Sequence, residues 1–288
     1  MKAMVTLAIS GLRAEDCERG DCMLCSQVEI PPTSLADVLA RLSVRSIAGI
    51  RGAAQVLHET ALSIANLRTA ACANIASKDP MIDGEGEVLA SKVFGWREPG
   101  ERWWERPRLA LTSPLTQACR YESEPFWCNS AGIHTQLRNT HLSALDLTDF
   151  CERAMTEVAI VIPIHLPYGQ IAAVSFQPAD AHRDDLTEEF ALYGDLLGLF
   201  AHKFIATYVK VMDKQRWIPS DISLSKREIE CLAWAAVGKT DGEIATILAR
   251  SCATIRFHIH NAAVKLNAVN RSQTVFKAGQ LGFLGSVH

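Results

Sequence analysis

Residues 251–266 combine the spacing of an amphipathic helix with side chains that can read the edges of DNA bases. One predicted face is apolar and would pack inside the protein: Ile255, Ile259, Ala262 and Leu266. The opposite face consists of Ala253, Phe257, His260 and Val264, with Arg256 and Asn261 at its edges. In the major groove an arginine can bond guanine, and an apolar side chain can contact a thymine methyl. An exposed phenylalanine with few acidic neighbours therefore indicates base recognition.

The flanks of the same helix present groups that suit phosphate contact. Thr254, His258 and Lys265 lie there, where the two sugar–phosphate strands would run. Ser251 begins this helix and Thr240 begins the preceding one, so two positive helix ends would add affinity for phosphate.

Capping residues place the helices that must position these groups. Residues that can begin helices stand at Ser225, Thr240, Ser251 and Asn270. Glu228 and Glu243 follow the first two by three positions, the spacing of a capping box, with Leu224 and Ile229 placed as a hydrophobic staple. Four caps also fit any small helical bundle. The exposed face of the third helix favours a helix-turn-helix instead.

Charge is distributed unevenly between this segment and the rest of the chain. Residues 222–288 hold eight Lys/Arg and four Asp/Glu, whereas the preceding residues hold 21 and 28, so a segment of +4 follows a body of −7. A basic block on an acidic body suits phosphate contact at one end only.

Residues 224–284 resemble the LuxR-type (GerE-like) helix-turn-helix along their whole length, through LSKREIECLAWAAVGKTDGEIATIL and ATIRFHIHNAAVKLNAVNRSQTVFKAGQLGFL. The family's characteristic places hold Glu228, Leu232, Gly238, Ile244, Ala245, Thr254, Ile255, His258, Lys265, Leu266, Asn270 and Arg271. The resemblance implies DNA contacts from Lys239, Thr240, Thr254, Arg256, His258 and Lys265. Ala253 departs from the polar or charged residue usual in the family, so readout there would be apolar or lost.

The fourth predicted helix, 271–281, carries the small residues Val275, Ala278 and Gly279 close to one face. The resemblance implies that this helix forms a homodimer; packing within its own module is the alternative. A dimer would read a pseudo-palindromic DNA site with half-sites roughly one helical turn apart.

Periodicity upstream predicts helices over 34–49, 52–66 and 186–212, and strand-like pieces near 68–75 and 88–95. Val158, Ile160, Ile162 and Ile164 alternate with Ala159, Val161, Pro163 and His165, and the chain returns over residues 170–176. This predicts a hairpin over 157–177. Because both of its faces are apolar, we expect both to be covered.

Residues 34–212 resemble the autoinducer-binding domain of quorum-sensing LuxR regulators through ERWWERPR (101–108), SPLTQACRYESEPFW (113–127) and EVAIVIPIHLPYGQIAAVSF (157–176). The resemblance implies an antiparallel sheet flanked by helices, with an acyl-homoserine lactone between sheet and helices. A mostly apolar cavity with a few polar groups suits such an amphiphile. The ligand contacts implied are Trp103 or Trp104 to the lactone, Phe126 and Trp127 as the aromatic wall, and Ser175 to an acyl or amide oxygen.

Ser113-Pro114 stands where that family has Asp-Pro, whose carboxylate accepts the ligand's amide N–H, and Pro107 replaces a tyrosine. Loss of a charge-assisted acceptor would cost about 1.5–3 kcal/mol, or roughly ten- to hundredfold in affinity. The cavity would then bind a different ligand, or none. In the latter case the aromatic residues are ordinary core, and the domain acts through protein interactions or cysteine redox chemistry.

Other chemistry finds little support in the sequence. Cys17, Cys22 and Cys25 have the C-x4-C-x2-C spacing of plant-type iron–sulphur proteins, but no fourth cysteine lies nearby. No nucleophile elbow, P-loop, zinc-protease motif or phosphoacceptor pocket is present, so we expect neither an enzyme nor a response-regulator receiver, and no metal or cofactor. The nine cysteines are an odd number and are scattered outside the first 30 residues. Together with the lack of a secretory signal and of an apolar run of membrane length, they indicate the cytoplasm.

The length of 288 residues suits two domains. The predicted organisation is an extension over 1–30, a ligand-sensing domain over 31–212, a linker over 213–221 and a DNA-binding domain over 222–288. The predicted class is α+β, an α/β/α sandwich around an antiparallel sheet followed by a four-helix helix-turn-helix domain. The resemblance implies a dimeric transcription regulator that acts on RNA polymerase.

Overall fold

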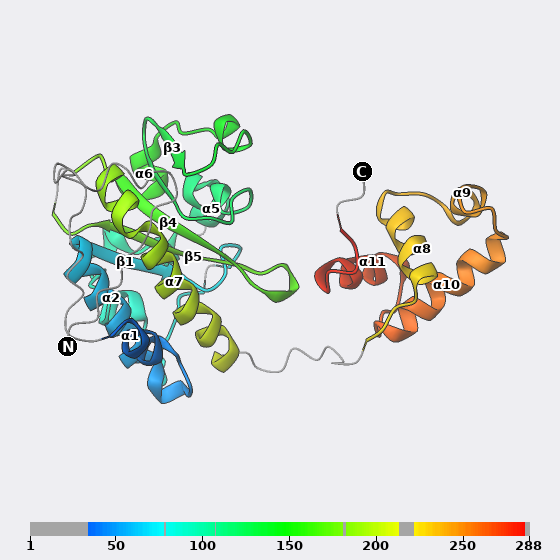
Figure 1. Ribbon diagram of the computed structural model, residues 1–288, viewed down its shortest axis with the longest axis horizontal. Helices are drawn as coiled ribbons and strands as arrows, with labels where there is room; N and C mark the ends of the chain where they lie inside the picture. Colours follow the sequence, from blue (N-terminus) through cyan, green and yellow to red (C-terminus); the bar gives the residue numbers. More distant parts are fainter. Residues whose placement is uncertain (1–33, 78, 107, 181–182, 213–221, 286–288) are drawn as a thin grey trace, which may run out of the picture.

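The computed structural model describes residues 34–77, 79–106, 108–180, 183–212 and 222–285. Up to residue 212 the described chain contains both helices and the strands of one sheet. From residue 222 onward its regular elements are all helices (Figure 1). The extension predicted over 1–30, with its three cysteines, and the linker predicted over 213–221 lie outside the described residues. The domain boundaries therefore remain predictions.

Five strands form one antiparallel sheet in the order β1-β5-β4-β2-β3. The strands are β1 Leu67–Cys72, β2 Phe126–Asn129, β3 Gly132–Thr135, β4 Val158–His165 and β5 Ile171–Pro178. The hairpin predicted over 157–177 is confirmed as β4 and β5, with Ile160 opposite Phe176. Its turn places Gly169 at φ 71°, a left-handed conformation that glycine adopts without steric cost.

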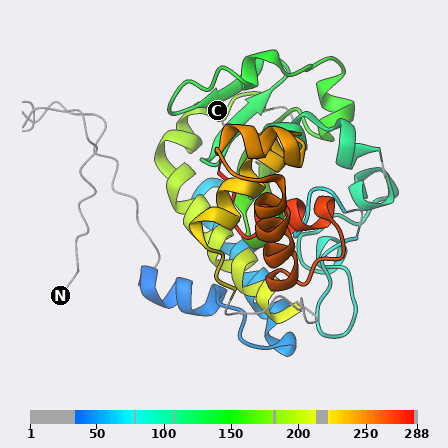
Figure 2. The same cartoon turned by 90° about the vertical axis from the view of Figure 1, so that its right-hand side faces the viewer.

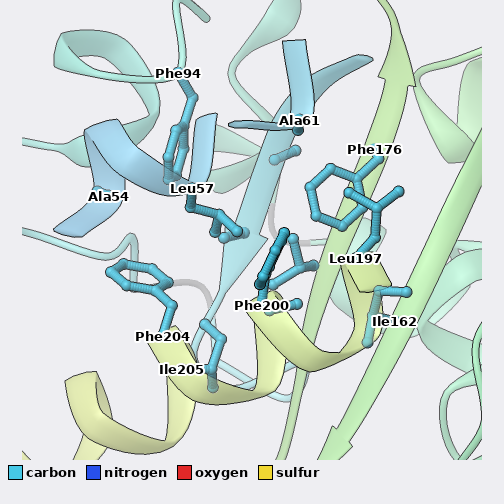
Figure 3. Packing of buried hydrophobic residues seen from close by; sticks show 14 of the residues in the cluster. Ala54, Leu57, Ala61, Phe94, Ile162, Phe176, Leu197, Phe200, Phe204 and Ile205 are labelled. Atoms are coloured by element: carbon cyan, nitrogen blue, oxygen red, sulfur yellow. The ribbon is translucent and has the colours of Figure 1, made fainter. Parts of the chain in front are cut away.

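Two helices cover one face of the sheet, α2 Ile50–Ala65 and α7 Thr187–Met212, and α1 Leu35–Leu42 packs against both of them. The helix predicted over 186–212 is confirmed as α7. Ile162 of β4 and Phe176 of β5 point to this face, where they pack with Leu57, Leu197 and Phe204 (Figure 3). Burying one such side chain contributes about 1.5–3 kcal/mol, so this face holds the main hydrophobic core.

Short elements cover the opposite face: η3 Pro99–Glu101, η4 Trp103–Glu105, α4 Leu109–Thr112, α5 Pro114–Ala118 and α6 Phe150–Ala154. Val161 of β4 and Phe126 of β2 pack there in a second cluster with Phe150. The hairpin is thus covered on both sides, and the predicted α+β class is confirmed. Four short segments complete this part: η2 Ile47–Gly49, α3 Leu89–Lys92, η5 Leu142–Ala144 and η6 Pro167–Gly169.

Two predicted elements differ from the structure. The single helix predicted over 34–49 ends at Leu42, because the Val44 N–H bonds the Thr207 hydroxyl of α7 at 2.9 Å instead of continuing the helix. The strand predicted near 88–95 is wrong, since this segment contains α3. Leu89, Ala90 and Phe94 are buried there, and a short apolar run has the same composition in a buried helix as in a strand.

Four helices form the C-terminal part, and all four predicted caps are confirmed. They are α8 Lys226–Ala236, α9 Asp241–Ile247, α10 Cys252–Lys265 and α11 Arg271–Gln280, which begin after Ser225, Thr240, Ser251 and Asn270. The Ser225 and Thr240 hydroxyls each accept a backbone N–H at 3.3 Å, and both capping boxes are complete. Within the described ranges, none of the helices combines the length and the apolar character needed to cross a membrane.

A matched pair on α7 tests the position of the main core. Leu197→Ala should lower the free energy of unfolding by about 2–5 kcal/mol, because Leu197 is fully buried and its removal leaves a cavity. Leu199→Ala is the control, since Leu199 is 45% exposed and its loss should cost less than about 1 kcal/mol. Urea unfolding followed by tryptophan fluorescence measures both variants. Equal losses would contradict the assignment of Leu197 to the core.

Candidate nucleic-acid interface and ligand cavity

Helix α10 has the two faces that the sequence predicts. Ile255, Ile259 and Ala262 are buried against the neighbouring helices α8 and α9. The opposite side is exposed, and Phe257 presents 61% of its surface (Figure 2 shows the C-terminal helices in front). Exposed with it are Ala253, Arg256, His260 and Val264. The face predicted to read bases is therefore not used for packing within the described part of the chain.

One carboxylate connects three helices of the C-terminal part. Asp241, the first residue of α9, forms an ion pair with Arg271, the first residue of α11. Arg271 also donates to the Lys239 carbonyl at 2.6 Å. Arg256 reaches the same carboxylate from α10, with 3.4 Å between its Nε and Asp241 Oδ2. Because the Arg256 side chain is 72% exposed, this contact is weak and the guanidinium is free to reorient.

Lys265 makes a contact that the sequence reading missed. Its Nζ lies 2.8 Å from Oε2 of Glu228, whose side chain is 4% exposed. Burial alone would raise the pKa of the Glu228 carboxyl, but hydrogen bonds from Lys265 and from Ser225 outweigh it and hold the pKa below its ordinary value. Lys265 thus stabilises the junction of α8 and α10. Its predicted contact with phosphate stays a prediction.

The remaining predicted DNA contacts surround these groups. The Thr240 and Ser251 hydroxyls act as helix caps, and Ser251 Oγ lies 2.8 Å from the hydroxyl of Thr254. Lys239 forms a surface ion pair with Glu243 at 3.5 Å. His258 is half-buried, with its ring centroid 5.7 Å from that of Phe257. Four predicted DNA contacts therefore already have partners within the protein, with which a phosphate group would have to compete: Lys239, Thr240, Ser251 and Thr254.

A cavity of about 410 Å³ lies in the N-terminal part, between the sheet and the short elements on its second face. Its floor is made by small side chains of the edge strand β1 and its neighbour β5, among them Ala70 of β1 and Ala173 and Ser175 of β5. Trp96, Trp103 and Trp104 line it from the other side. Small residues on the floor leave the volume open, and its size is typical of a small-molecule site.

The three tryptophans form a continuous wall. The ring of Trp103 meets Trp96 edge-on at 6.0 Å and Trp104 edge-on at 4.8 Å. The Trp96 indole N–H donates to the Thr69 carbonyl at 2.6 Å, and the Arg68 guanidinium lies 3.9 Å from the Trp96 ring. Sequence reasoning missed Trp96. Two features of the sequence could have indicated it: the tryptophan pair that follows a few residues later, and the strand ending at Cys72, against which it packs.

Four of the six predicted ligand contacts line this cavity, namely Trp103, Trp104, Ser113 and Ser175. Trp127 does not, because it lies on the other face of the sheet, stacked on His134 with centroids 4.0 Å apart. Phe126 is fully buried on the cavity side but packs in the cluster with Phe150 and does not line the cavity. Neighbouring strand residues point to opposite faces, so these two could not share one wall.

The described cysteines are all free thiols. Burial raises the pKa of Cys72, on the cavity floor, to about 11, and burial also raises the pKa values of Cys119 and Cys128. Such thiols are weak nucleophiles at neutral pH. No grouping of His, Cys, Asp and Glu suited to a metal ion occurs in the described ranges.

Comparison with known families matches the description "Bacterial regulatory proteins, luxR family" to residues 222–278, which span helices α8 to α10 and most of α11. This segment belongs to the luxR family. The luxR-family segment ends at Ala278, inside α11.

Curated relatives match a larger part of the chain. The transcriptional activator protein VanR of Vibrio anguillarum is 40% identical over 126 residues, which are 43% of this chain and 50% of VanR. The transcriptional activator protein LuxR of Aliivibrio fischeri is 36% identical over 117 residues, 40% of this chain and 45% of LuxR. The chain thus matches about half the length of these relatives. A solved structure of SdiA in complex with octanoyl-rac-glycerol covers 88% of this chain and 96% of its own, at 20% identity and a TM-score of 0.44.

The Lys265–Glu228 pair generates a stability prediction for the luxR-family segment. Lys265→Met should destabilise it by about 1–3 kcal/mol at neutral pH, because a buried carboxylate loses its strongest donor. The loss should shrink on acidification. A carboxyl whose folded pKa is depressed stabilises the fold above its unfolded pKa, near 4.5, and that contribution disappears as pH falls through the folded value.

Glu228→Gln combined with Lys265→Met is the control, because it removes the buried charge together with its partner. Part of the lost stability should return in this double variant. Thermal unfolding between pH 3 and pH 7 measures the effect. A loss that does not depend on pH would contradict the electrostatic role of the pair.

Proposed function

We propose that the protein is a DNA-binding transcription regulator of the LuxR type, controlled by a small amphiphile in the N-terminal cavity. The observation that carries the proposal is the exposed side of α10 in a luxR-family segment. Phe257 and His260 project from it, with Arg256 beside them. A major groove accommodates both an exposed aromatic side chain and a reorienting guanidinium.

The proposed partner on this side is double-stranded DNA with a pseudo-palindromic sequence. Phe276 of α11 is 64% exposed and Gly279 is exposed, while Ala278 packs in the module's own core. An exposed apolar residue beside a glycine supports a homodimer through α11, although Ala278 itself serves the internal packing. Two copies of α10 would then lie in successive major grooves, in reach of RNA polymerase.

The N-terminal cavity supports the sensing half of the proposal. Its lining combines three tryptophans and small apolar residues with hydroxyl, amide and charged groups, the last including Glu101, Arg106 and Arg153. This composition suits an acyl-homoserine lactone or a related amphiphile, and the curated relatives are named transcriptional activators. A ligand bound only by the folded state would stabilise that state in proportion to its saturation. The free thiols of the described residues suit the cytoplasm.

Selection of duplexes from a random library by the full-length protein tests the DNA half. A dyad-symmetric sequence should be enriched. Arg256→Ala should then weaken binding to that sequence by about 1–3 kcal/mol and leave binding to random duplex nearly unchanged. Arg227→Ala is the control, because it removes the same charge from an exposed position on α8. It should leave the ratio of affinities for the selected and the random duplex unchanged. Equal loss on both duplexes for Arg256→Ala would refute base reading.

Thermal unfolding with added amphiphiles tests the sensing half. A ligand present at 100 times its Kd should stabilise the folded protein by about 2.7 kcal/mol. Ala173→Leu fills the cavity floor and should abolish this shift, whereas Ala191→Leu on the exposed side of α7 should not. A midpoint that no amphiphile moves would favour a ligand-free interaction domain.

A further inference from the structure

The turn of the β4–β5 hairpin, η6, lies against helix α11 (Figure 1). The Gln280 side chain donates a hydrogen from Nε2 to the Tyr168 carbonyl at 3.1 Å, across 112 positions of the chain. Gln280 is half-buried, whereas Phe276, four positions before it, is 64% exposed. A segment of the N-terminal part thus covers one end of α11.

The arm that carries this turn is held at its base. The Leu166 N–H donates to the Gln170 carbonyl at 2.8 Å and closes the turn. The Gln170 side chain donates to the Ala73 carbonyl at 2.6 Å, and the Ile171 carbonyl accepts the Ile75 N–H at 2.8 Å. These bonds connect the base of the turn to the segment that follows β1. The sheet therefore sets the position of the turn.

Tyr168 has an uncommon backbone conformation for so large a residue, with φ at 66°. A residue other than glycine adopts this left-handed conformation only at a steric cost. Such costs concentrate in segments that take part in binding or switching. The carbonyl that accepts the Gln280 bond belongs to this same residue. The unusual backbone and the contact with α11 therefore coincide at one position.

The covered end of α11 belongs to the face that the proposed homodimer uses. Residues three and four positions apart share one face of a helix, so Gln280 lies beside Phe276 and near Gly279. One helical turn rises about 5.4 Å, whereas a partner helix with its side chains is about 10 Å across. A second copy of α11 packed over Phe276 would therefore need the space that the hairpin turn occupies.

We infer that the hairpin turn is an autoinhibitory contact, which competes with a second copy of this chain for α11. The inference rests on the homodimer proposed above and adds a step that controls it. The turn has to leave α11 in both copies before they can pair, so the fraction of uncovered chains enters the apparent dissociation constant twice. If about half of the chains are covered, association is weakened roughly fourfold.

Shortening the turn in the full-length protein tests this competition. Replacement of residues 167–169 by Asn-Gly keeps both strands, because Asn-Gly favours a two-residue hairpin turn, and it leaves α11 unchanged. Sedimentation equilibrium should give the shortened protein a dimer dissociation constant at least threefold below that of the wild type. A smaller change would overturn the inference and leave the homodimer standing. No association in either protein would refute both.

Gln280→Ala is a second test that leaves the hairpin intact. It removes the donor to the Tyr168 carbonyl and should also strengthen association at least threefold. Ser272→Ala is the matched control, because Ser272 is exposed on α11 about two turns away, and should change the constant less than twofold. If the shortened hairpin does not fold, unchanged association in Gln280→Ala overturns the inference instead.

Phe276→Glu identifies the surface through which the copies associate. Added to the shortened protein, it places a charge on the proposed dimer face and should cancel the gain. A gain that persists would show association through another surface and would overturn the inference.

The duplex selection described above separates this inference from DNA binding. Stronger association through α11 without any selected duplex would support the contact and refute the DNA half of the proposed function. A selected dyad-symmetric duplex with unchanged association would do the reverse.

Discussion

The structure of the N-terminal part depends on a strand pair that is covered on both faces but filled differently on each. Beneath α2 and α7, the residues of β4 and β5 are large and close-packed, as Ile162 and Phe176 show (Figure 3). On the other face β5 presents the small residues Ala173 and Ser175. One side of the sheet can therefore provide stability while the other retains space.

The elements with strong local signals could be predicted from the sequence, and those set by distant contacts could not. The four caps of the C-terminal helices act on the next three residues, so their chemistry is visible in sequence. The end of α1 depends on Thr207, which is 163 positions away from Val44. The burial of Leu89 and Phe94 likewise comes from helices packed over them and leaves no trace in a short apolar run.

The candidate sites show the same division. The exposed side of α10 follows from a period of 3.6 residues and was predictable, because the helix was correctly placed. The sequence predicted that Phe126 and Trp127 share one wall, but they are neighbours in a strand, where side chains alternate between the two faces. Trp103 and Trp104 lie in a 3-10 turn and both line the cavity. Lys265 was assigned to phosphate because its partner, Glu228, is 37 positions away.

Asp241 gives the recognition module an internal competitor for its own arginine. Arg256 lies near this carboxylate, and in the proposed complex with DNA it would leave the carboxylate to bond a base. Breaking this contact would cost about 0.2–1 kcal/mol, the range for an exposed pair. Only a sequence that offers the guanidinium two well-placed acceptors repays it. Under the same proposal, a duplex that does not engage Arg256 leaves the pair intact, so the contact would subtract slightly from the affinity for the correct site alone.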